Sequence, residues 1–387
     1  MKIANVVLND FTRDNRVLKT ALSLAEVGHE VTVVALHGNH LPRVEHHLAG
    51  FRIERVHAYV PALRILAFFK WAEFAFRIVL TYRKVDVWHC NDAEAFGMGL
   101  LAKWSRPRLK LVYDCHEFES ERNGKPAWLS KAVQRMESRH IHKAEEVIVV
   151  SPSIQAAYES RYADRGMRRI SLVRNVPGAR SGSSTAHHPL RKNLGLKEDD
   201  FVAIYQGALT INRGIETLLA MAPRLTGGRI HLVFMGYGLL EPEVMEAVKG
   251  SPNVHFQPAV PYEAVLDYTA DADVGLVSVK PVCLSYLYCL PNKLFESIQA
   301  GIPVLVNNLP DCVELIEQFG IGARVVNDTP EGWYDALNEA EGKSPAWKVQ
   351  AIGRIREAQA SLNWENESRR LTAIYDRLKA NENLNLE

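Results

Sequence analysis

The sequence predicts an α/β protein built from two Rossmann-like domains that face a cleft. Short, nearly continuous apolar runs alternate with helix-length segments, and the same rhythm appears in each half of the 387-residue chain. Such runs are typical of parallel strands that helices cover on both faces. Residues 178–193 are small and polar and lack periodicity, which indicates a linker. We expect domains over 1–177 and 195–364, a linker over 178–194, and a helix over 365–387 that packs back on the first domain.

The individual elements follow in order from these runs. In the first half, strands are predicted over 3–8, 30–36, 85–90, 109–114 and 146–151. A helical pattern over 16–28 separates the first two of them. In the second half, strands are predicted over 201–207, 230–236, 253–257, 273–279 and 303–308. Since ligands of such folds bind at the carboxyl ends of strands, the loops that follow the strands should carry the site.

A short helix in the second half has a polar first turn. Pro291 and Asn292 begin this helix, and Gly301 ends it. The amides of its first turn, at Lys293 and Leu294, predict an anion site that the lysine charge reinforces.

Glu296 lies one turn further along the same face of that helix. Its carboxylate is suited to accept hydrogen bonds from a ribose diol beside a bound anion. Taken alone, Glu296 is also explained as a charge that complements the helix dipole.

The loop after the first strand, residues 9–16, contains no glycine. It therefore lacks the G-x-G-x-x-G fingerprint that a nicotinamide-dependent dehydrogenase would need there. Asp14 is expected to cap the next helix, and Arg16 is a candidate for binding an anion. Together with Asp92, which follows the strand at 85–90, these two residues are the candidates for contacting an acceptor or a phosphate.

Four further candidates lie at or after the ends of predicted strands. His116 comes after the strand at 109–114, titrates near neutral pH, and can donate to a phosphate or a hydroxyl. The alternative is a satisfied surface histidine. Arg213 precedes Gly214 at a helix start, an arrangement that suits a phosphate. Gly236 and Gly238 would let a nucleotide approach the backbone.

The composition is that of a folded, soluble enzyme, with 47% hydrophobic and 24% charged residues. The five cysteines form no CxxC pair and the sequence starts without a signal peptide, so reduced thiols in the cytosol are expected. No run of 18 apolar residues predicts a membrane span.

The charge is distributed unevenly along the chain. Lys and Arg outnumber Asp and Glu in residues 1–190 and are outnumbered in the remainder. Segment 64–84 mixes large apolar residues with cations, and segment 103–110 adds more cations. One interpretation is a surface that meets an anionic partner, such as a membrane or a phosphorylated acceptor. The other is an ordinary core-facing helix and chance variation between solvated surfaces.

Taken together, these segments resemble glycosyltransferase family 4, whose members are retaining enzymes of GT-B architecture. "RVLKTALSLAEVGHEVTVV" is similar to the first helix and second strand of that family, and "VYDCHEFES" carries its amino-terminal histidine, here His116. "YQGALTINRGIETLL" is similar to its phosphate segment, and "PNKLFESIQAGIPVLV" to its strongest signature, with Glu296. The resemblance covers most of the chain, in order.

The resemblance implies an amino-terminal acceptor-binding domain and a carboxy-terminal domain that binds a UDP- or GDP-linked sugar. Glu296 would hold the ribose, Arg213 and the amides around Leu294 the diphosphate, and His116 would approach the donor sugar. These three side chains would be the catalytic ones, without a metal ion or cofactor, because positive groups stabilise the departing diphosphate. Further donor contacts are expected from Gly236, Gly238, Val260, Tyr288, Asn292 and Lys293, with Val260 in the loop that frames the base.

The implied activity is that of a hexosyl- or N-acetylhexosaminyl-transferase that acts on a glycan or lipid-linked acceptor in cell-surface polysaccharide or glycolipid biosynthesis. The enzyme would be cytoplasmic, with peripheral contact to the inner face of an anionic membrane and no nucleic-acid partner. Two alternatives stay open: a nucleotide-sugar 2-epimerase and a non-catalytic nucleotide-sugar-binding protein.

The sequence departs from the family pattern in three places. Tyr288 stands eight positions before Glu296, where the family often has a second glutamate. Arg213 replaces the usual lysine, and residues 9–16 replace a glycine-rich loop. The "DAD" at 271–273 matches the D-x-D of metal-dependent glycosyltransferases, but it precedes a strand, so we expect capping residues there.

Overall fold

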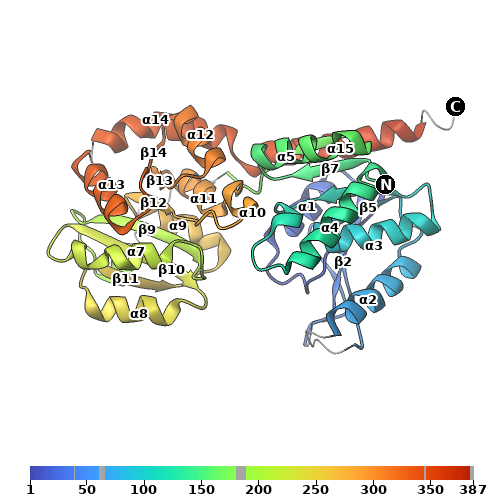
Figure 1. Ribbon diagram of the computed structural model, residues 1–387, viewed down its shortest axis with the longest axis horizontal. Helices are drawn as coiled ribbons and strands as arrows, with labels where there is room; N and C mark the ends of the chain where they lie inside the picture. Colours follow the sequence, from blue (N-terminus) through green and yellow to red (C-terminus); the bar gives the residue numbers. More distant parts are fainter. Residues whose placement is uncertain (39, 61–65, 180–188, 344–345, 384–387) are drawn as a thin grey trace. The chain divides into compact units, whose positions relative to one another are not determined.

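The computed structural model divides the chain into two compact units (Figure 1). The first unit comprises Met1–Arg174 and Glu367–Glu387, and the second comprises Asn175–Asn366. The structure describes residues 1–38, 40–60, 66–179, 189–343 and 346–383. Within these ranges, no helix combines the length and the apolar character needed to cross a membrane.

The first unit is built on an eight-stranded sheet with the order β3-β4-β2-β1-β5-β6-β7-β8. All neighbouring strands are parallel except β3 and β4. The strands are β1 (Lys2–Val6), β2 (Glu30–Leu36), β3 (Val44–His46), β4 (Arg52–Val56), β5 (Val87–Asn91), β6 (Lys110–Asp114), β7 (Glu146–Val149) and β8 (Ile170–Leu172). The chain leaves the central pair β1 and β5 in opposite directions, which makes their carboxyl ends a topological switch point.

Helices cover the sheet of the first unit, and its central strands are therefore buried. Every residue of β5 and of β7 is buried, as expected for parallel strands covered on both faces. The helices are α1 (Asn15–Glu26), α2 (Ala67–Thr81), α3 (Asp92–Ser105), α4 (Ala127–His140), α5 (Pro152–Tyr162) and α15 (Trp364–Asn383).

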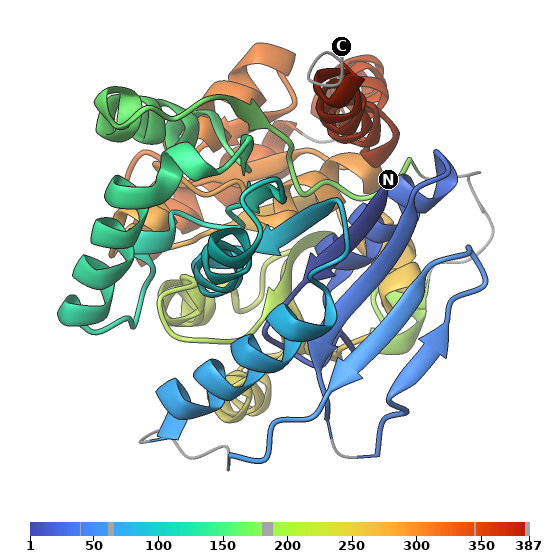
Figure 2. The ribbon, with the colours of Figure 1, turned by 90° about the vertical axis from the view of Figure 1, so that its right-hand side faces the viewer.

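The carboxy-terminal helix α15 belongs to the first unit from Glu367 onward. Its Tyr375 hydroxyl lies 2.7 Å from Nδ1 of His89 on β5, and Lys110 of β6 donates to the Leu378 carbonyl at 2.7 Å. Figure 2 shows the end of α15, in dark red, near the amino terminus of the chain. The helix therefore anchors strands at the centre of a sheet that is far from it in sequence.

The second unit is built on a six-stranded, fully parallel sheet with the order β11-β10-β9-β12-β13-β14. The strands are β9 (Phe201–Ala208), β10 (Ile230–Tyr237), β11 (Val254–Pro258), β12 (Val274–Val277), β13 (Val304–Val306) and β14 (Gly322–Arg324). The helices are α6 (Pro189–Leu194), α7 (Ile215–Met221), α8 (Glu241–Gly250), α9 (Val265–Ala270), α10 (Leu284–Leu287), α11 (Asn292–Ala300), α12 (Pro310–Phe319), α13 (Pro330–Lys343) and α14 (Ala346–Ser361). Here β9 and β12 form the switch point.

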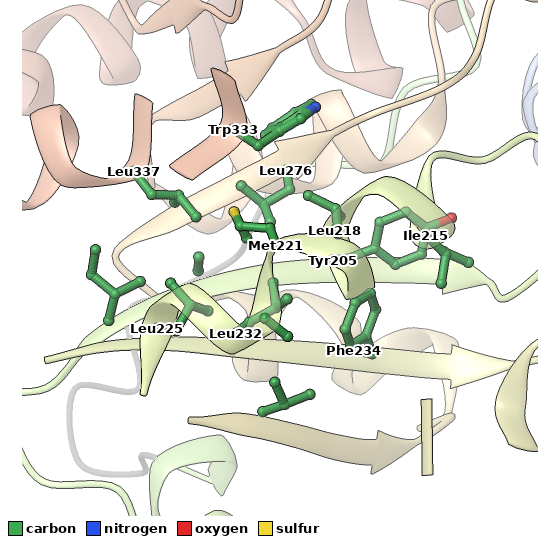
Figure 3. Close-up of a cluster of buried hydrophobic side chains, with 14 of the residues drawn as sticks. Tyr205, Ile215, Leu218, Met221, Leu225, Leu232, Phe234, Leu276, Trp333 and Leu337 are labelled. Carbon is green, nitrogen blue, oxygen red and sulfur yellow. The ribbon is translucent and has the colours of Figure 1, made fainter. Parts of the chain in front are cut away.

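A large hydrophobic cluster fills the space between the sheet and the helices α7 and α13 of this unit (Figure 3). Tyr205 and Phe234 from the strands, Met221 from α7 and Trp333 from α13 are all almost completely buried. Tyr205 lies near the carboxyl end of β9, so the core of this unit extends directly to the edge where ligands of such sheets bind.

The prediction of two parallel α/β domains is confirmed. The sheets also contain strands that the sequence pattern misses, namely β3, β4, β8 and β14. These strands lie at or near sheet edges and are short or mixed in polarity, so they lack a continuous apolar run.

The stretch expected to be a linker is partly helical. Residues 180–188 lie outside the described residues, but Pro189–Leu194 forms α6, and Leu190 is fully buried. The two aspartates of "DAD" bind this helix. Asp271 accepts from the Leu190 amide at 2.8 Å, and Asp273 forms an ion pair with Arg191 at 2.7 Å. None of the five cysteines forms a disulfide.

Candidate functional site

Helix α11 has the boundaries expected from its sequence, with Pro291 before it and Gly301 in the left-handed conformation at its end. Asn292 and Glu296, one turn apart, are the two residues of α11 that are not buried. The helix is fixed against β9 because Gln206 donates to the Lys293 carbonyl at 3.3 Å and to the Ser297 hydroxyl at 3.2 Å. The exposed stripe of α11 is thus held at a defined place beside the sheet.

The backbone at the start of α11 corrects one expectation. The Leu294 amide donates to the Pro291 carbonyl at 3.0 Å and is therefore not an open donor for an anion. A tight first turn of this kind uses up an amide that a regular α-helix would leave unpaired. Asn292, by contrast, is exposed, and its Oδ1 accepts from Asn175 at 3.1 Å.

Lys293 is buried rather than displayed at the surface. Its side chain is 7% exposed, and its Nζ lies 3.2 Å from the centroid of the Tyr205 ring. Among the described residues, Nζ has no hydrogen-bond partner. Burial, and next the nearby Arg213 charge, hold the pKa of Lys293 well below its usual range. Lys293 is therefore a buried amine in this state of the protein, and the reinforcement of an anion site by its charge stays a prediction.

Arg213 lies in the loop between β9 and α7, near Lys293. Its guanidinium stacks on the Tyr286 ring, 4.4 Å from the ring centroid, and its carbonyl accepts from Ser278 at 2.9 Å. Gly214, the next residue, adopts φ +81°, and a Cβ there would come within 1.8 Å of the Ser278 carbonyl oxygen. Close packing against β12 thus requires this glycine and fixes the backbone that carries Arg213.

Gly236 is the penultimate residue of strand β10 and Gly238 directly follows that strand, and the contact of both glycines with a nucleotide stays a prediction. A Cβ on Gly236 would lie 1.9 Å from the Gly207 carbonyl oxygen, and a Cβ on Gly238 would lie 2.4 Å from that of Leu209. Both glycines are thus required by the close approach of β9 and of Leu209, which directly follows it. Room for a nucleotide is not needed to explain them.

Glu296 lies close enough to Tyr262 to affect it electrostatically. Burial, followed by the Glu296 charge, raises the pKa of Tyr262 to about 12. Tyr262 comes two residues after Val260, whose side chain packs partly against a core cluster. Helix α11 and the predicted base-framing loop therefore lie side by side. Tyr262 itself was not predicted, because it follows the strand by several residues and carries no motif. Tyr288, half-buried, directly follows the short helix α10.

In the first unit, His116 lies where strands β5 and β6 end. Its Nε2 is 3.1 Å from the Asn91 side-chain oxygen, and its Nδ1 is 3.6 Å from Asp92 Oδ1. Asp114 Oδ2 lies 3.7 Å from Nε2. Burial would lower the pKa of His116, but Asp92 and Asp114 outweigh this effect, so the pKa is raised. The imidazole thus lies among three side-chain oxygens that can accept hydrogen bonds, and the residue is half-buried.

Asp92 has a strained backbone, with φ +65° in a residue that has a side chain. It opens α3 directly after β5, and its Oδ1 is buried and accepts no hydrogen bond from any described residue. Strain of this kind persists only where the surroundings enforce it and is concentrated at functional sites. The structure brings Asp92 and His116 together just beyond the carboxyl ends of the neighbouring strands β5 and β6.

Arg16 and Asp14 are part of the framework instead. Arg16 is buried and makes a two-pronged ion pair with Asp114, at 3.0 and 2.6 Å, and a third bond to the Val173 carbonyl. The charge of Arg16 is thereby paired and three of its five N–H donors are used, so Arg16 serves the framework of this unit in the structure, and its binding of an anion stays a prediction. Asp14 caps α1 by accepting from the Val17 amide at 3.1 Å, as expected.

A cluster of ion pairs that the sequence analysis did not predict adjoins His116. Glu119 is completely buried, accepts from the Ala93 amide at 3.3 Å, and lies 3.5 Å from Arg122 and 3.7 Å from Lys125. Arg122 also reaches Asp92 Oδ2 at 3.8 Å. The alternation of acids and bases in residues 117–125 is the signal that could have indicated these ion pairs.

Comparisons with known proteins agree with this architecture. Residues 15–175 match the family model described as Glycosyltransferase Family 4, and residues 200–341 match Glycosyl transferases group 1. An uncharacterized glycosyltransferase of Methanocaldococcus jannaschii is 25% identical over 324 residues, which is 80% of each chain. The two matched models together cover most of the chain, one in each unit.

Solved structures share the fold at lower identity. Sucrose-phosphate synthase from Thermosynechococcus elongatus aligns with a TM-score of 0.81 at 20% identity, over 98% of this chain and 99% of that one. HepE of Anabaena in complex with UDP-glucose aligns with 0.72 at 16% identity, over 98% and 100%. WaaG, a glycosyltransferase involved in lipopolysaccharide biosynthesis, aligns with 0.62 at 18% identity, over 94% and 98%.

Proposed function

Because the chain belongs to glycosyltransferase family 4 and has the GT-B fold, we propose that it transfers a hexose or N-acetylhexosamine, with retained stereochemistry, from a nucleotide-sugar to a glycan or lipid-linked acceptor. Cell-surface polysaccharide or glycolipid biosynthesis is the proposed setting, on the cytoplasmic side of a membrane. A uridine diphosphate sugar is the preferred donor class, since HepE, which has a similar fold, binds UDP and UDP-glucose.

The observation that supports this function most is the group of residues at the carboxyl end of β9. Arg213 supplies positive charge there, the buried Lys293 adds an amine, and Glu296 lies one turn into the adjoining helix. In the proposed complex Arg213 and the protonated form of Lys293 bind the diphosphate, and Glu296 accepts from the ribose hydroxyls. Tyr288 and Asn292 adjoin the donor, and Val260 and Tyr262 adjoin the base. His116, with Asp92 beside it, acts on the donor sugar and acceptor from the first unit.

A binding screen followed by a transfer assay tests the proposal. A nucleotide or nucleotide-sugar present at one hundred times its Kd stabilises the protein by about 2.7 kcal/mol, which thermal unfolding detects readily. The best donor is then incubated alone and with lipid or glycan extracts. Conversion of the donor alone to an epimer would indicate the 2-epimerase, which neither the family matches nor the relatives favour. Binding without any transfer would indicate the non-catalytic protein.

The reaction is expected to proceed without a metal ion. In the proposed complex Arg213 and Lys293 are two basic groups beside the leaving diphosphate, and such preorganised groups can replace a divalent cation. Transfer rates measured with excess EDTA should equal those without it, and added magnesium should change them less than twofold. Loss of activity in EDTA that magnesium restores would contradict this expectation.

We also propose that the first unit contacts an anionic membrane through helices α2 and α3. Segment 64–84 forms α2 from Ala67 onward, whereas Arg64 and Ile65 lie outside the described residues. The two helices pack against each other and expose large apolar side chains: Phe68, Phe69, Phe76 and Leu80 of α2, and Leu101 and Trp104 of α3. Arg83, Lys84 and Arg108 follow them and are exposed. Aromatic side chains flanked by cations suit the bilayer interface.

Removing two of these cations should weaken vesicle binding. Each Lys or Arg near an anionic surface contributes about 1 kcal/mol, so the double variant Arg83→Gln/Lys84→Gln should lose about 25-fold in affinity for phosphatidylserine vesicles. Co-sedimentation measures the loss, with the charge-matched variant Arg229→Gln/Lys249→Gln of the second unit as the control. Binding that ignores both salt concentration and anionic lipid content would refute the proposal.

A further inference from the structure

Lys293 presents an unusual combination of burial and missing partners. Its side chain is more than nine-tenths buried, and its Nζ has no hydrogen-bond partner among the residues that the structure describes. An isolated buried ammonium is costly, and proteins commonly avoid the cost by releasing the proton. The amine must therefore lose its proton, depend on the face of the Tyr205 ring for stabilisation, or acquire an anion.

The groups around Lys293 do not supply that anion. The face of the Tyr205 ring lies against Nζ, and the Tyr205 hydroxyl is already bonded to the Ala208 carbonyl at 3.0 Å. Arg213, on the loop after β9, repels a second positive charge. Glu296 on the same helix and Cys289 before it act in the opposite direction, but burial and Arg213 outweigh them. The resting site thus disfavours the protonated amine.

The amine nevertheless lies where the proposed donor would place negative charge. A Cβ built on Gly207, at the carboxyl end of β9, would lie 3.9 Å from Lys293 Cε. Arg213 follows this strand end, and Glu296 lies one turn beyond Lys293. A diphosphate bound to Arg213 would therefore also be a neighbour of Nζ, and its charge would stabilise the ammonium strongly at such a poorly hydrated place.

We propose that Lys293 takes up one proton from solvent when the diphosphate of the donor binds and releases it when the nucleoside diphosphate leaves. This inference rests on the proposed function, because it assigns the diphosphate to the same site. The buried amine then becomes charged only in the complex, so it binds the diphosphate without burying an unpaired charge in the free enzyme. Donor affinity should accordingly fall with rising pH, by up to tenfold per pH unit between the pKa values of the free and the bound amine.

Calorimetric titration with UDP tests the coupling. Measurements between pH 7 and 9 are suitable, because a terminal phosphate with a second pKa near 6 is then almost fully ionised. Titrations in two buffers with different ionisation enthalpies give the number of protons taken up per UDP. We expect uptake of up to one proton in the wild type and none in Lys293→Met, whose side chain has similar length and no charge.

Three variants separate this effect from other sources. Lys249→Met, at an exposed lysine of α8, should leave both affinity and uptake unchanged. Cys289→Ser should retain the uptake, which excludes the neighbouring thiol. Lys293→Gln replaces Lys293→Met if the latter fails to fold, although Lys293→Met is expected to raise the Tm of the free enzyme, since it removes a poorly accommodated amine.

The outcomes distinguish the two proposals. Equal apparent enthalpies in both buffers for the wild type, or uptake that persists in both Lys293 variants, would overturn the proton coupling while leaving the proposed function intact. Absence of binding for UDP and for every other nucleoside diphosphate would instead count against the proposed function itself.

Discussion

Replacing Glu296 with alanine is expected to lower kcat/KM for the nucleotide-sugar donor by about 10- to 150-fold for each hydrogen bond that is lost. The proposed bonds from the ribose hydroxyls to the carboxylate are charge-assisted, and each contributes roughly 1.5–3 kcal/mol. Glu296→Gln keeps the shape and one acceptor oxygen, so its loss should be intermediate. Steady-state kinetics with purified donor measure both effects.

Stability should hardly respond to this change. Glu296 is half-buried on the exposed stripe of α11, and its interaction with the helix dipole contributes at most about 1 kcal/mol. Glu246→Ala, at an exposed carboxylate of α8, is the matched control and should leave the kinetics unchanged. A 2′-deoxyribose donor provides a second test, because wild type should discriminate against it and Glu296→Ala should not. Normal kinetics with reduced stability would show that Glu296 only complements the helix dipole.

Replacing His116 with alanine should reduce kcat by about 10²- to 10³-fold, the usual loss when one preorganised hydrogen-bond donor is removed from a reacting site. Donor affinity should change little, because the proposed diphosphate and ribose contacts come from the other unit. Single-turnover rates and thermal-shift titrations measure the two quantities separately. His142→Ala is the matched control, since His142 belongs to the same unit but precedes β7 at the amino end of the sheet.

A variant of Asp92 tests the protonation state of His116. Asp92 and Asp114 raise the pKa of His116, so the imidazolium persists to higher pH than for an isolated histidine. If the imidazolium is the active form, activity declines as pH rises through this pKa, and Asp92→Asn should move the decline to lower pH.

For His116→Ala, a collapse of donor affinity together with normal turnover at saturating donor would contradict the proposed role of His116 at the reacting sugar.

Many residues of the candidate site could be chosen from the order of strands and loops in the sequence. His116, Asp92 and Arg213 follow apolar runs, and parallel strands bring such positions to one edge of their sheet. Glu296 lies one turn into a helix whose start the sequence predicts. The neighbours that determine the burial and the pKa of these residues could not be predicted from the sequence. Arg16 and Asp114 are 98 positions apart, and only the pairing order of the strands makes them a buried ion pair.

The two parallel α/β units and the limits of α11 could be predicted from the sequence, because apolar periodicity and the residues that start and end helices act over a few neighbouring positions. The burial of Lys293 against Tyr205, and the hydrogen bond from the Leu294 amide to the Pro291 carbonyl, became clear only from the three-dimensional structure. Burial and the direction of a side chain depend on what other elements place around it. Those elements are distant in the chain, so no local pattern encodes the result.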